Sequence, residues 1–151
     1  MRPVGARAIT LLFLSGTLAC GAVKRVHECE RVIATVNEGL SELYLQVPDA
    51  GASPAAYSAI ADGYAALGRK LDELAPSDTA LAKAVTSYRE LTQRAAENSR
   101  AYGQALSKPA RSRKQRREKE AQLSRLRADA QSDVSRETQA VRKLNGVCHP
   151  Q

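Results

Sequence analysis

The side chains best suited to chemistry in this sequence are three cysteines and two histidines. His27 and Cys29 lie together near the start of the helical part of the chain, and Cys148 and His149 lie together at its end. If these two ends meet, the side chains form either a disulfide or a Cys₂His₂ metal site. Zinc sites usually space their ligands as Cys-x₂₋₄-Cys and His-x₃₋₅-His, which these pairs do not match. The spacing therefore favours the disulfide over metal binding.

No set of residues in the chain forms a recognisable active site. Neither histidine lies in a catalytic sequence context. No histidine falls inside the four helices predicted below, and the Glu-x-x-His pattern of di-iron bundles is missing. We therefore expect no catalytic residues, no metal site, no cofactor and no enzymatic activity.

The first 19 residues have the parts of a secretory signal. Arg2 and Arg7 make the start basic, residues 8–14 are apolar, and small residues follow up to Cys20. The apolar stretch is much shorter than the roughly 20 residues that cross a bilayer, which argues against a retained membrane helix. This pattern predicts export and removal of residues 1–19, although an apolar first helix is the alternative.

The run Thr17-Leu18-Ala19-Cys20 resembles a bacterial lipobox, where signal peptidase II cuts before a cysteine that becomes lipidated. Ala19 and Cys20 match that pattern, whereas Thr17 stands where the family usually has Leu. The resemblance implies a palmitate-bearing lipid anchor of three chains on Cys20, which would hold the protein firmly at a membrane. By the same resemblance, Gly21 in place of Asp favours the outer membrane of a bacterial cell envelope.

An ordinary secretory cut is the competing interpretation of this segment. Thr17 with Ala19, and Cys20 with Ala22, both satisfy a small-x-small rule. Such a cut would give a periplasmic or secreted protein without a lipid.

The rest of the chain predicts an all-α fold. Hydrophobic residues make up 43% of the sequence but aromatic residues only 4%, and runs of β-branched residues are absent. Four segments instead space apolar residues three and four apart, which is typical of amphipathic helices. The stripes are Cys29, Ile33, Val36, Leu40, Leu43 and Val47; Tyr57, Ile60, Tyr64, Leu67, Leu71 and Leu74; Leu81, Val85, Tyr88, Leu91, Ala95, Tyr102 and Leu106; and Leu123, Leu126, Ala130, Val134, Val141 and Leu144.

Short breaks separate these helices. Ser53-Pro54 and Asp78 are expected to start the second and third helices, and Asn145-Gly146 to end the fourth. Short breaks make neighbouring helices antiparallel, so residues 26–151 predict one domain, an up-down-up-down four-helix bundle joined to the anchor by residues 20–25. Stripes of this kind usually form a packed core rather than a ligand tunnel.

This topology brings the first and last cysteines together. In an antiparallel four-helix bundle the start of the first helix and the end of the fourth lie at the same pole. Disulfides persist in exported proteins, so we expect a Cys29–Cys148 bridge that leaves Cys20 for the lipid. A bridge over so long a loop stabilises the fold by roughly 2–4 kcal/mol.

Residues 108–119, which we name the basic tip, are the densest cluster of charge in a chain of net charge +7. The candidate binding residues for an anionic partner are Arg111, Arg113, Lys114, Arg116, Arg117 and Lys119. Such clusters bind phosphate-rich polymers, although most charge runs are simply solvated surface. The export signal and the lack of interleaved aromatic residues argue against nucleic acid.

The position of these cations has two consequences. Positive charge at the start of a helix opposes the macrodipole, so we expect either frayed first turns or a compensating anion. The third and fourth helices also exceed the first two in length, which predicts a polar helical hairpin extending beyond the bundle. This hairpin would lie at the pole opposite Cys20, roughly 45 Å away.

Together these features favour a membrane-anchored envelope lipoprotein with a structural or interaction role. Its expected partners are the membrane, through the anchor, and an anionic cell-wall polymer or acidic protein at the basic tip. A soluble periplasmic or secreted protein with a binding or chaperone-like role is the alternative. A third class, a cytosolic nucleic-acid-binding helical protein, requires that residues 1–19 remain attached.

Overall fold

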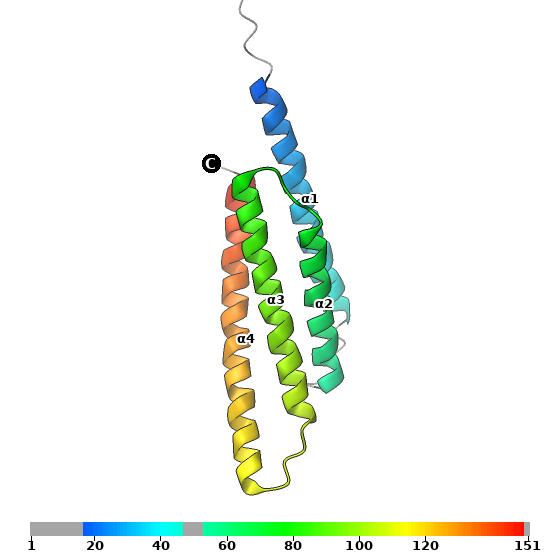
Figure 1. Ribbon diagram of the computed structural model, residues 1–151, viewed down its shortest axis with the longest axis vertical. Helices are drawn as coiled ribbons and strands as arrows, with labels where there is room; N and C mark the ends of the chain where they lie inside the picture. Colours follow the sequence, from blue (N-terminus) through cyan, green and yellow to red (C-terminus); the bar gives the residue numbers. More distant parts are fainter. Residues whose placement is uncertain (1–16, 47–52, 150–151) are drawn as a thin grey trace, which may run out of the picture.

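The computed structural model describes residues 17–46 and 53–149 as four antiparallel helices. They are α1 (Thr17–Gln46), α2 (Pro54–Asp72), α3 (Thr79–Ser107) and α4 (Arg113–Cys148), and no strand occurs among these residues. Figure 1 shows each helix running opposite to the one before it. The predicted all-α, up-down-up-down four-helix arrangement is therefore confirmed.

Two of the predicted helix starts are confirmed by their capping bonds. The Ser53 hydroxyl accepts a hydrogen bond from the Ala56 backbone N–H at 3.1 Å, with Pro54 as the first residue of α2. The Asp78 carboxylate accepts from the Leu81 N–H at 2.9 Å at the start of α3. Each side chain satisfies an N–H group that the first helical turn leaves without a partner.

The ends of α1 and α4 differ from the prediction. α1 begins at Thr17, so residues 20–25, expected as a linker, are helical. α4 continues through Asn145-Gly146 to Cys148, and Gly146 has no positive φ, so it does not act as a helix terminator. The last turn is instead held by contacts with α1: Cys148 is bonded to Cys29, and the Val147 carbonyl oxygen accepts from Arg25. Val47, the last residue of the first predicted stripe, lies outside the described residues.

The main core lies in the half of the bundle that contains Cys29 and Cys148. Tyr88, Leu67, Leu71, Leu81 and Val32 are its largest fully buried apolar side chains. Most of the predicted stripe residues of α1, α2 and α3 are buried or half-buried. The stripes therefore predicted the core-facing sides of these three helices, although Val32 was not among them.

α1 and α2 approach each other closely through reciprocal glycine contacts. A Cβ atom added to Gly39 of α1 would lie 2.6 Å from the Leu67 side chain of α2, and one added to Gly63 of α2 would lie 2.5 Å from the Leu43 side chain of α1. Only glycine leaves room for the buried leucine opposite. These contacts hold α1 mainly against α2.

Neighbouring helices bury much less of α4 than was predicted. Its contacts with α1 are few, and Leu144 is its one buried apolar residue among those that the structure describes. Val134 is 63% exposed and Ala130 is also exposed, so the expectation that the whole fourth stripe is core is wrong. The reason is that α1 pairs with α2 and leaves the middle of α4 uncovered.

The predicted extension of the α3–α4 hairpin is confirmed, but the expected difference in helix length is wrong for α3, which has 29 residues against 30 in α1. Figure 1 shows the first turns of α4 and the end of α3 reaching beyond the neighbouring end of α2. Side chains on residues 113–118 are all exposed. The extension is therefore a two-helix hairpin whose far end carries the basic tip.

Candidate functional site

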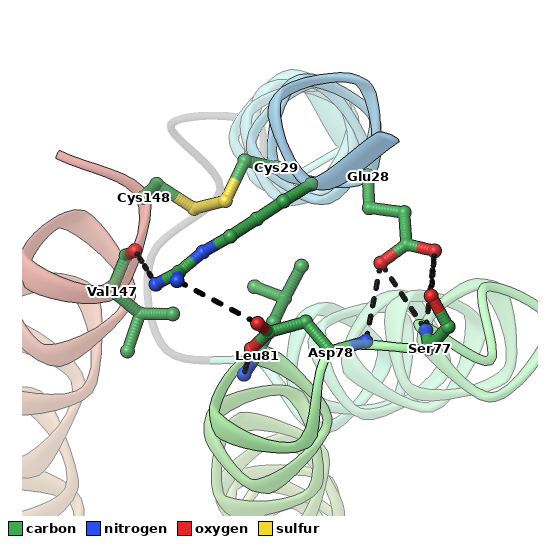
Figure 2. The surroundings of a disulfide bond; sticks show 8 residues. Glu28, Cys29, Ser77, Asp78, Leu81, Val147 and Cys148 are labelled. Carbon is green, nitrogen blue, oxygen red and sulfur yellow. Dashed lines mark hydrogen bonds and ion pairs between the residues drawn. A yellow bond between two sulfur atoms is a disulfide. The ribbon is translucent and has the colours of Figure 1, made fainter. Parts of the chain in front are cut away.

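The pole where α1 and α4 meet is held by the predicted disulfide, which is confirmed. Cys29 and Cys148 are bonded with their Cα atoms 5.5 Å apart, and 119 residues separate them in the sequence. Figure 2 shows the bridge joining α1 to the end of α4 above the start of α3. Cys29 is only 4% exposed, so the bond is part of the core. We call this end of the molecule the disulfide pole.

Arg25 connects three helices at the disulfide pole. Its Nη2 donates a hydrogen bond to the Val147 carbonyl oxygen at 2.7 Å, and its Nη1 lies 3.6 Å from Asp78 Oδ2. The first contact satisfies a carbonyl that the end of a helix leaves free, and the second adds an ion pair to the residue that caps α3. Arg25 lies one turn before Cys29, so the same face of α1 carries both the covalent and the polar link to α4.

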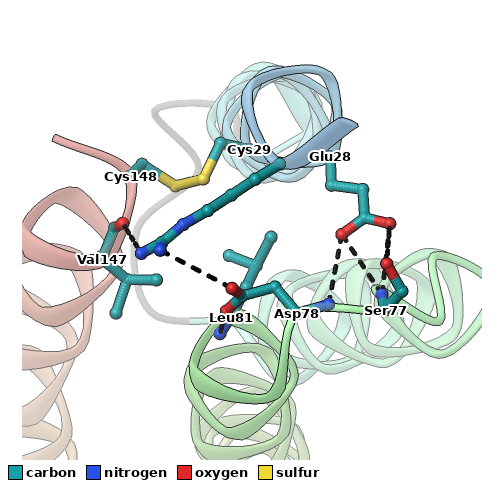
Figure 3. Close-up of polar contacts among 8 residues, drawn as sticks. Glu28, Cys29, Ser77, Asp78, Leu81, Val147 and Cys148 are labelled. Carbon is teal, nitrogen blue, oxygen red and sulfur yellow. Dashed lines mark hydrogen bonds and ion pairs between the residues drawn. A yellow bond between two sulfur atoms is a disulfide. The ribbon is translucent and has the colours of Figure 1, made fainter. Parts of the chain in front are cut away.

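Glu28 binds the turn between α2 and α3. Its carboxylate accepts hydrogen bonds from the Ser77 hydroxyl at 2.7 Å, from the Ser77 N–H at 3.2 Å and from the Asp78 N–H at 3.3 Å. Figure 3 shows Glu28 reaching from α1 to this turn. The Ser77 hydroxyl is the largest cause that lowers the pKa of Glu28 below its ordinary value of 4.5. The charged carboxylate therefore organises the start of α3.

The alternative Cys₂His₂ metal site is not formed in this arrangement. Both sulfurs that would bind a metal are bonded to each other. His27 Nδ1 lies 3.3 Å from Glu30 Oε2 on the exposed side of α1, so the expectation that no histidine falls inside a helix is wrong. His149 follows α4 at its C-cap. Within residues 17–46 and 53–149, no group of three or more His, Cys, Asp or Glu side chains is placed to hold a metal ion.

Cys20, the residue expected to carry the lipid, lies in the first turns of α1. It lies nine positions before Cys29, which places it about 13 Å beyond the disulfide pole at the rise of an α-helix. The surroundings of its side chain lie outside the described residues. Across the part of the chain that the structure describes, none of the helices has the length and hydropathy of a membrane span.

The basic tip begins with a capping box that the sequence analysis did not consider. The Ser112 hydroxyl accepts from the Gln115 N–H at 3.1 Å, and the Gln115 side chain accepts from the Ser112 N–H at 3.2 Å. Gln115 also accepts from the Arg111 N–H at 2.9 Å. Because these bonds satisfy the first N–H groups of α4, a helical first turn follows despite its positive charge. The prediction allowed only frayed first turns or a bound anion, and it left out a capping box that satisfies these N–H groups.

The cations of the basic tip do not form one equivalent set. Lys119 donates to the carbonyl oxygens of Leu106 at 2.8 Å and Lys108 at 2.7 Å, so it caps the end of α3. Lys114 lies 4.0 Å from Glu118 one turn along α4. The four arginines of the tip make no ion pair with any residue that the structure describes and are exposed: Arg111, Arg113, Arg116 and Arg117.

Arg25 and Glu28 were not predicted from the sequence, and Lys119 was predicted to bind an anionic partner rather than the end of α3. Each of these side chains bonds to a backbone group on another element. Such contacts cannot be recognised from the spacing of residues in the sequence. The nearest available signal was the placement of Arg25 and Cys29 on one helical face. Searches of family models, curated proteins and solved structures each returned no match to this chain. The assignment of function therefore rests on the geometry above.

We predict that Glu28→Gln lowers the melting temperature at neutral pH and that this difference shrinks on acidification. A carboxyl whose pKa is lowered by folding stabilises the fold above its unfolded pKa, and this contribution is lost as pH falls through the folded pKa. The window for Glu28 therefore opens at about pH 4.5 and extends below it. Thermal unfolding monitored by circular dichroism between pH 3 and pH 7 measures it.

Glu38→Gln is the matched control, because Glu38 is an exposed residue of the same helix. It should leave stability within about 0.5 kcal/mol of the native protein at all these pH values. Equal effects of the two substitutions would contradict the role of Glu28.

Proposed function

We propose that this protein is an exported lipoprotein of the bacterial envelope, anchored through Cys20, whose bundle is a non-enzymatic spacer presenting the basic tip to an anionic partner. One observation carries the proposal. The disulfide aligns the start of α1 with the end of α4, so the expected anchor and the basic tip lie at opposite ends of the molecule.

The disulfide supports the export part of the proposal. Disulfides form and persist in proteins that fold in oxidising compartments. The bridge uses two of the three cysteines and leaves Cys20, which lies in the lipobox-like run. The first residues of the chain resemble a signal for the same route.

The length of the molecule supports the spacer part. α4 has 36 residues, and Cys20 lies nine positions before Cys29 on α1. The anchor and the tip are therefore separated by on the order of 60 Å at helical rise. This separation exceeds the 45 Å expected from sequence, because α1 extends past the disulfide pole. A tip at this distance faces away from the membrane that carries the anchor.

The four uncommitted arginines support the binding part. Arg113, Arg116 and Arg117 are spaced three and four apart on α4, so they share one face of the helix. Guanidinium groups bind phosphate and carboxylate oxygens through two parallel N–H bonds. We favour an anionic cell-wall polymer as the partner, since a repeating charge along a chain matches a row of arginines. An acidic protein is the competing partner.

Lipidation is tested by labelling with radioactive palmitate in a Gram-negative bacterium that expresses the full chain. We expect label in the native protein and in the Cys29→Ala/Cys148→Ala control, and none in Cys20→Ala. The Cys20→Ala protein should also move from the membrane to the soluble fraction, because the acyl chains provide the attachment. An unmodified mature protein that starts at Val23 would show ordinary secretion and exclude the anchor.

Binding at the basic tip is tested with poly(glycerol phosphate) as the probe and poly-L-glutamate as the acidic-protein comparator. We expect substitution of all four uncommitted arginines by Gln to weaken probe binding by about tenfold or more, and added salt to weaken native binding. Isothermal titration at two ionic strengths measures both effects.

The matched control removes the same number of charges elsewhere, by Gln at the exposed Arg31, Lys83, Arg94 and Arg142. This control should retain native affinity. Equal loss in both variants would mean that net charge alone attracts the polymer, which contradicts a binding role for the tip. Tighter binding of poly-L-glutamate would favour an acidic protein.

A further inference from the structure

A groove of about 210 Å³ lies between α2, α3 and α4, outside the disulfide pole and the basic tip. Its apolar lining comes from all three helices: Tyr57, Ile60, Tyr64, Leu91, Ala95 and Val134. The volume is smaller than the roughly 300–1,000 Å³ of pockets for drug-sized ligands. The groove therefore has room for a small ligand with an apolar body.

The groove exists because α1 does not cover α4. The reciprocal contacts of Gly39 and Gly63 hold α1 against α2, and α1 has few contacts with α4. Val134 consequently stays 63% exposed beside the groove, although it belongs to an apolar stripe. Uncovered apolar residues at this position are what a ligand would shield from water.

The α4 side of the groove is acidic. Asp133 and Glu137 both line it and lie one helical turn apart. Asp133 has a neighbouring cation, since Arg136 Nη1 lies 3.3 Å from its Oδ1. Glu137 has no cationic partner in the part of the chain that the structure describes, and its Oε1 accepts a hydrogen bond from the Tyr88 hydroxyl at 3.0 Å. Glu137 therefore brings a fixed, uncompensated negative charge to an apolar groove.

Two tyrosines lie near this carboxylate: Tyr88 donates to it, and Tyr64 lines the same groove. Tyr64 lines the groove, and Tyr88 is fully buried behind it. Burial raises the pKa of Tyr64, and the negative charge of Glu137 raises it further. Asn98 also lines the groove, and its Oδ1 is a buried acceptor without a hydrogen-bond partner among the described residues. The polar groups of this wall are thus rich in acceptors and negative charge.

We propose that this groove binds a small amphiphilic organic cation, with its ammonium group against Glu137 and the Tyr64 ring and its hydrocarbon part on Ile60, Leu91 and Val134. A carboxylate and an aromatic ring together attract an ammonium group, and a partly desolvated site strengthens both attractions. An anionic ligand would meet two carboxylates. A neutral apolar ligand would leave the charge of Glu137 without a partner. This site does not depend on the lipid anchor or on the basic tip.

The test is an NMR titration of the ¹⁵N-labelled protein with n-octylammonium below its micelle concentration. We expect shifts of backbone resonances from the three groove-lining segments. The comparators are n-octanol, which has the same chain without charge, and octanoate, which has the opposite charge. Octanol should bind about tenfold more weakly or worse, and octanoate should not shift these resonances.

Two substitutions locate the binding. Glu137→Gln removes the charge but keeps an oxygen that accepts from Tyr88, so it should fold normally and bind octylammonium about tenfold more weakly. Val134→Lys places an ammonium group at an exposed position three residues before Glu137, where it should pair with that carboxylate and displace the ligand. Glu120→Gln, an exposed residue of the same helix, should bind as the native protein does. Circular dichroism checks that all three variants are folded.

The proposal is overturned if octanol binds as tightly as octylammonium, because the groove would then recognise only apolar surface. Unchanged affinity of folded Glu137→Gln would overturn it as well. If Glu137→Gln does not fold, the Val134→Lys titration decides, since that substitution replaces a side chain that is already exposed.

Discussion

The covalent bond between Cys29 and Cys148 holds α1 to α4 where few other contacts join these two helices. Elsewhere α1 packs on α2 through the glycine contacts, so the noncovalent structure alone leaves the first and last helices weakly connected. Bonds from Arg25 and Glu28 gather around the bridge and tie the same stretch of α1 to α4 and to the start of α3. Arg25 and Glu28 reach their partners only while α1 keeps its position along the bundle, and the disulfide fixes that position. The closed end of the bundle therefore depends on one cross-link.

The molecule divides into three regions along its length. The disulfide pole is closed, the middle is open on the side of α4, and the far hairpin is polar and basic. Each region follows from how α4 is covered: α3 packs along it, α1 contacts it at the pole, and a groove lies between it and α2 and α3 in the middle. This gradient explains why α4 has a regular apolar stripe but buries only Leu144 among the described residues.

Much of the fold was predictable from local patterns. Ser53 and Asp78 cap helices because their side chains reach N–H groups a few residues away, and the cysteine pairing follows from helix order. The exposure of Val134 was not predictable, because it depends on whether α1 packs mainly against α2 or against α4. Long-range bonds to backbone atoms, such as those of Arg25 and Lys119, likewise leave no trace in spacing. The prediction that α4 ends at Gly146 was wrong, because a helix continues through a glycine when tertiary contacts hold the turn beyond it.

The most direct test of this account is hydrogen–deuterium exchange of the purified protein before and after reduction of its disulfide, with Cys20→Ser as a control that reduction should affect in the same way. Reduction should remove roughly 2–4 kcal/mol of stability. We expect faster exchange in the first half of α1 and the last turns of α4, and retained protection where α2 packs on α3. Unchanged exchange at both helix ends, or an equal increase throughout the molecule, would contradict the central role of the Cys29–Cys148 bridge.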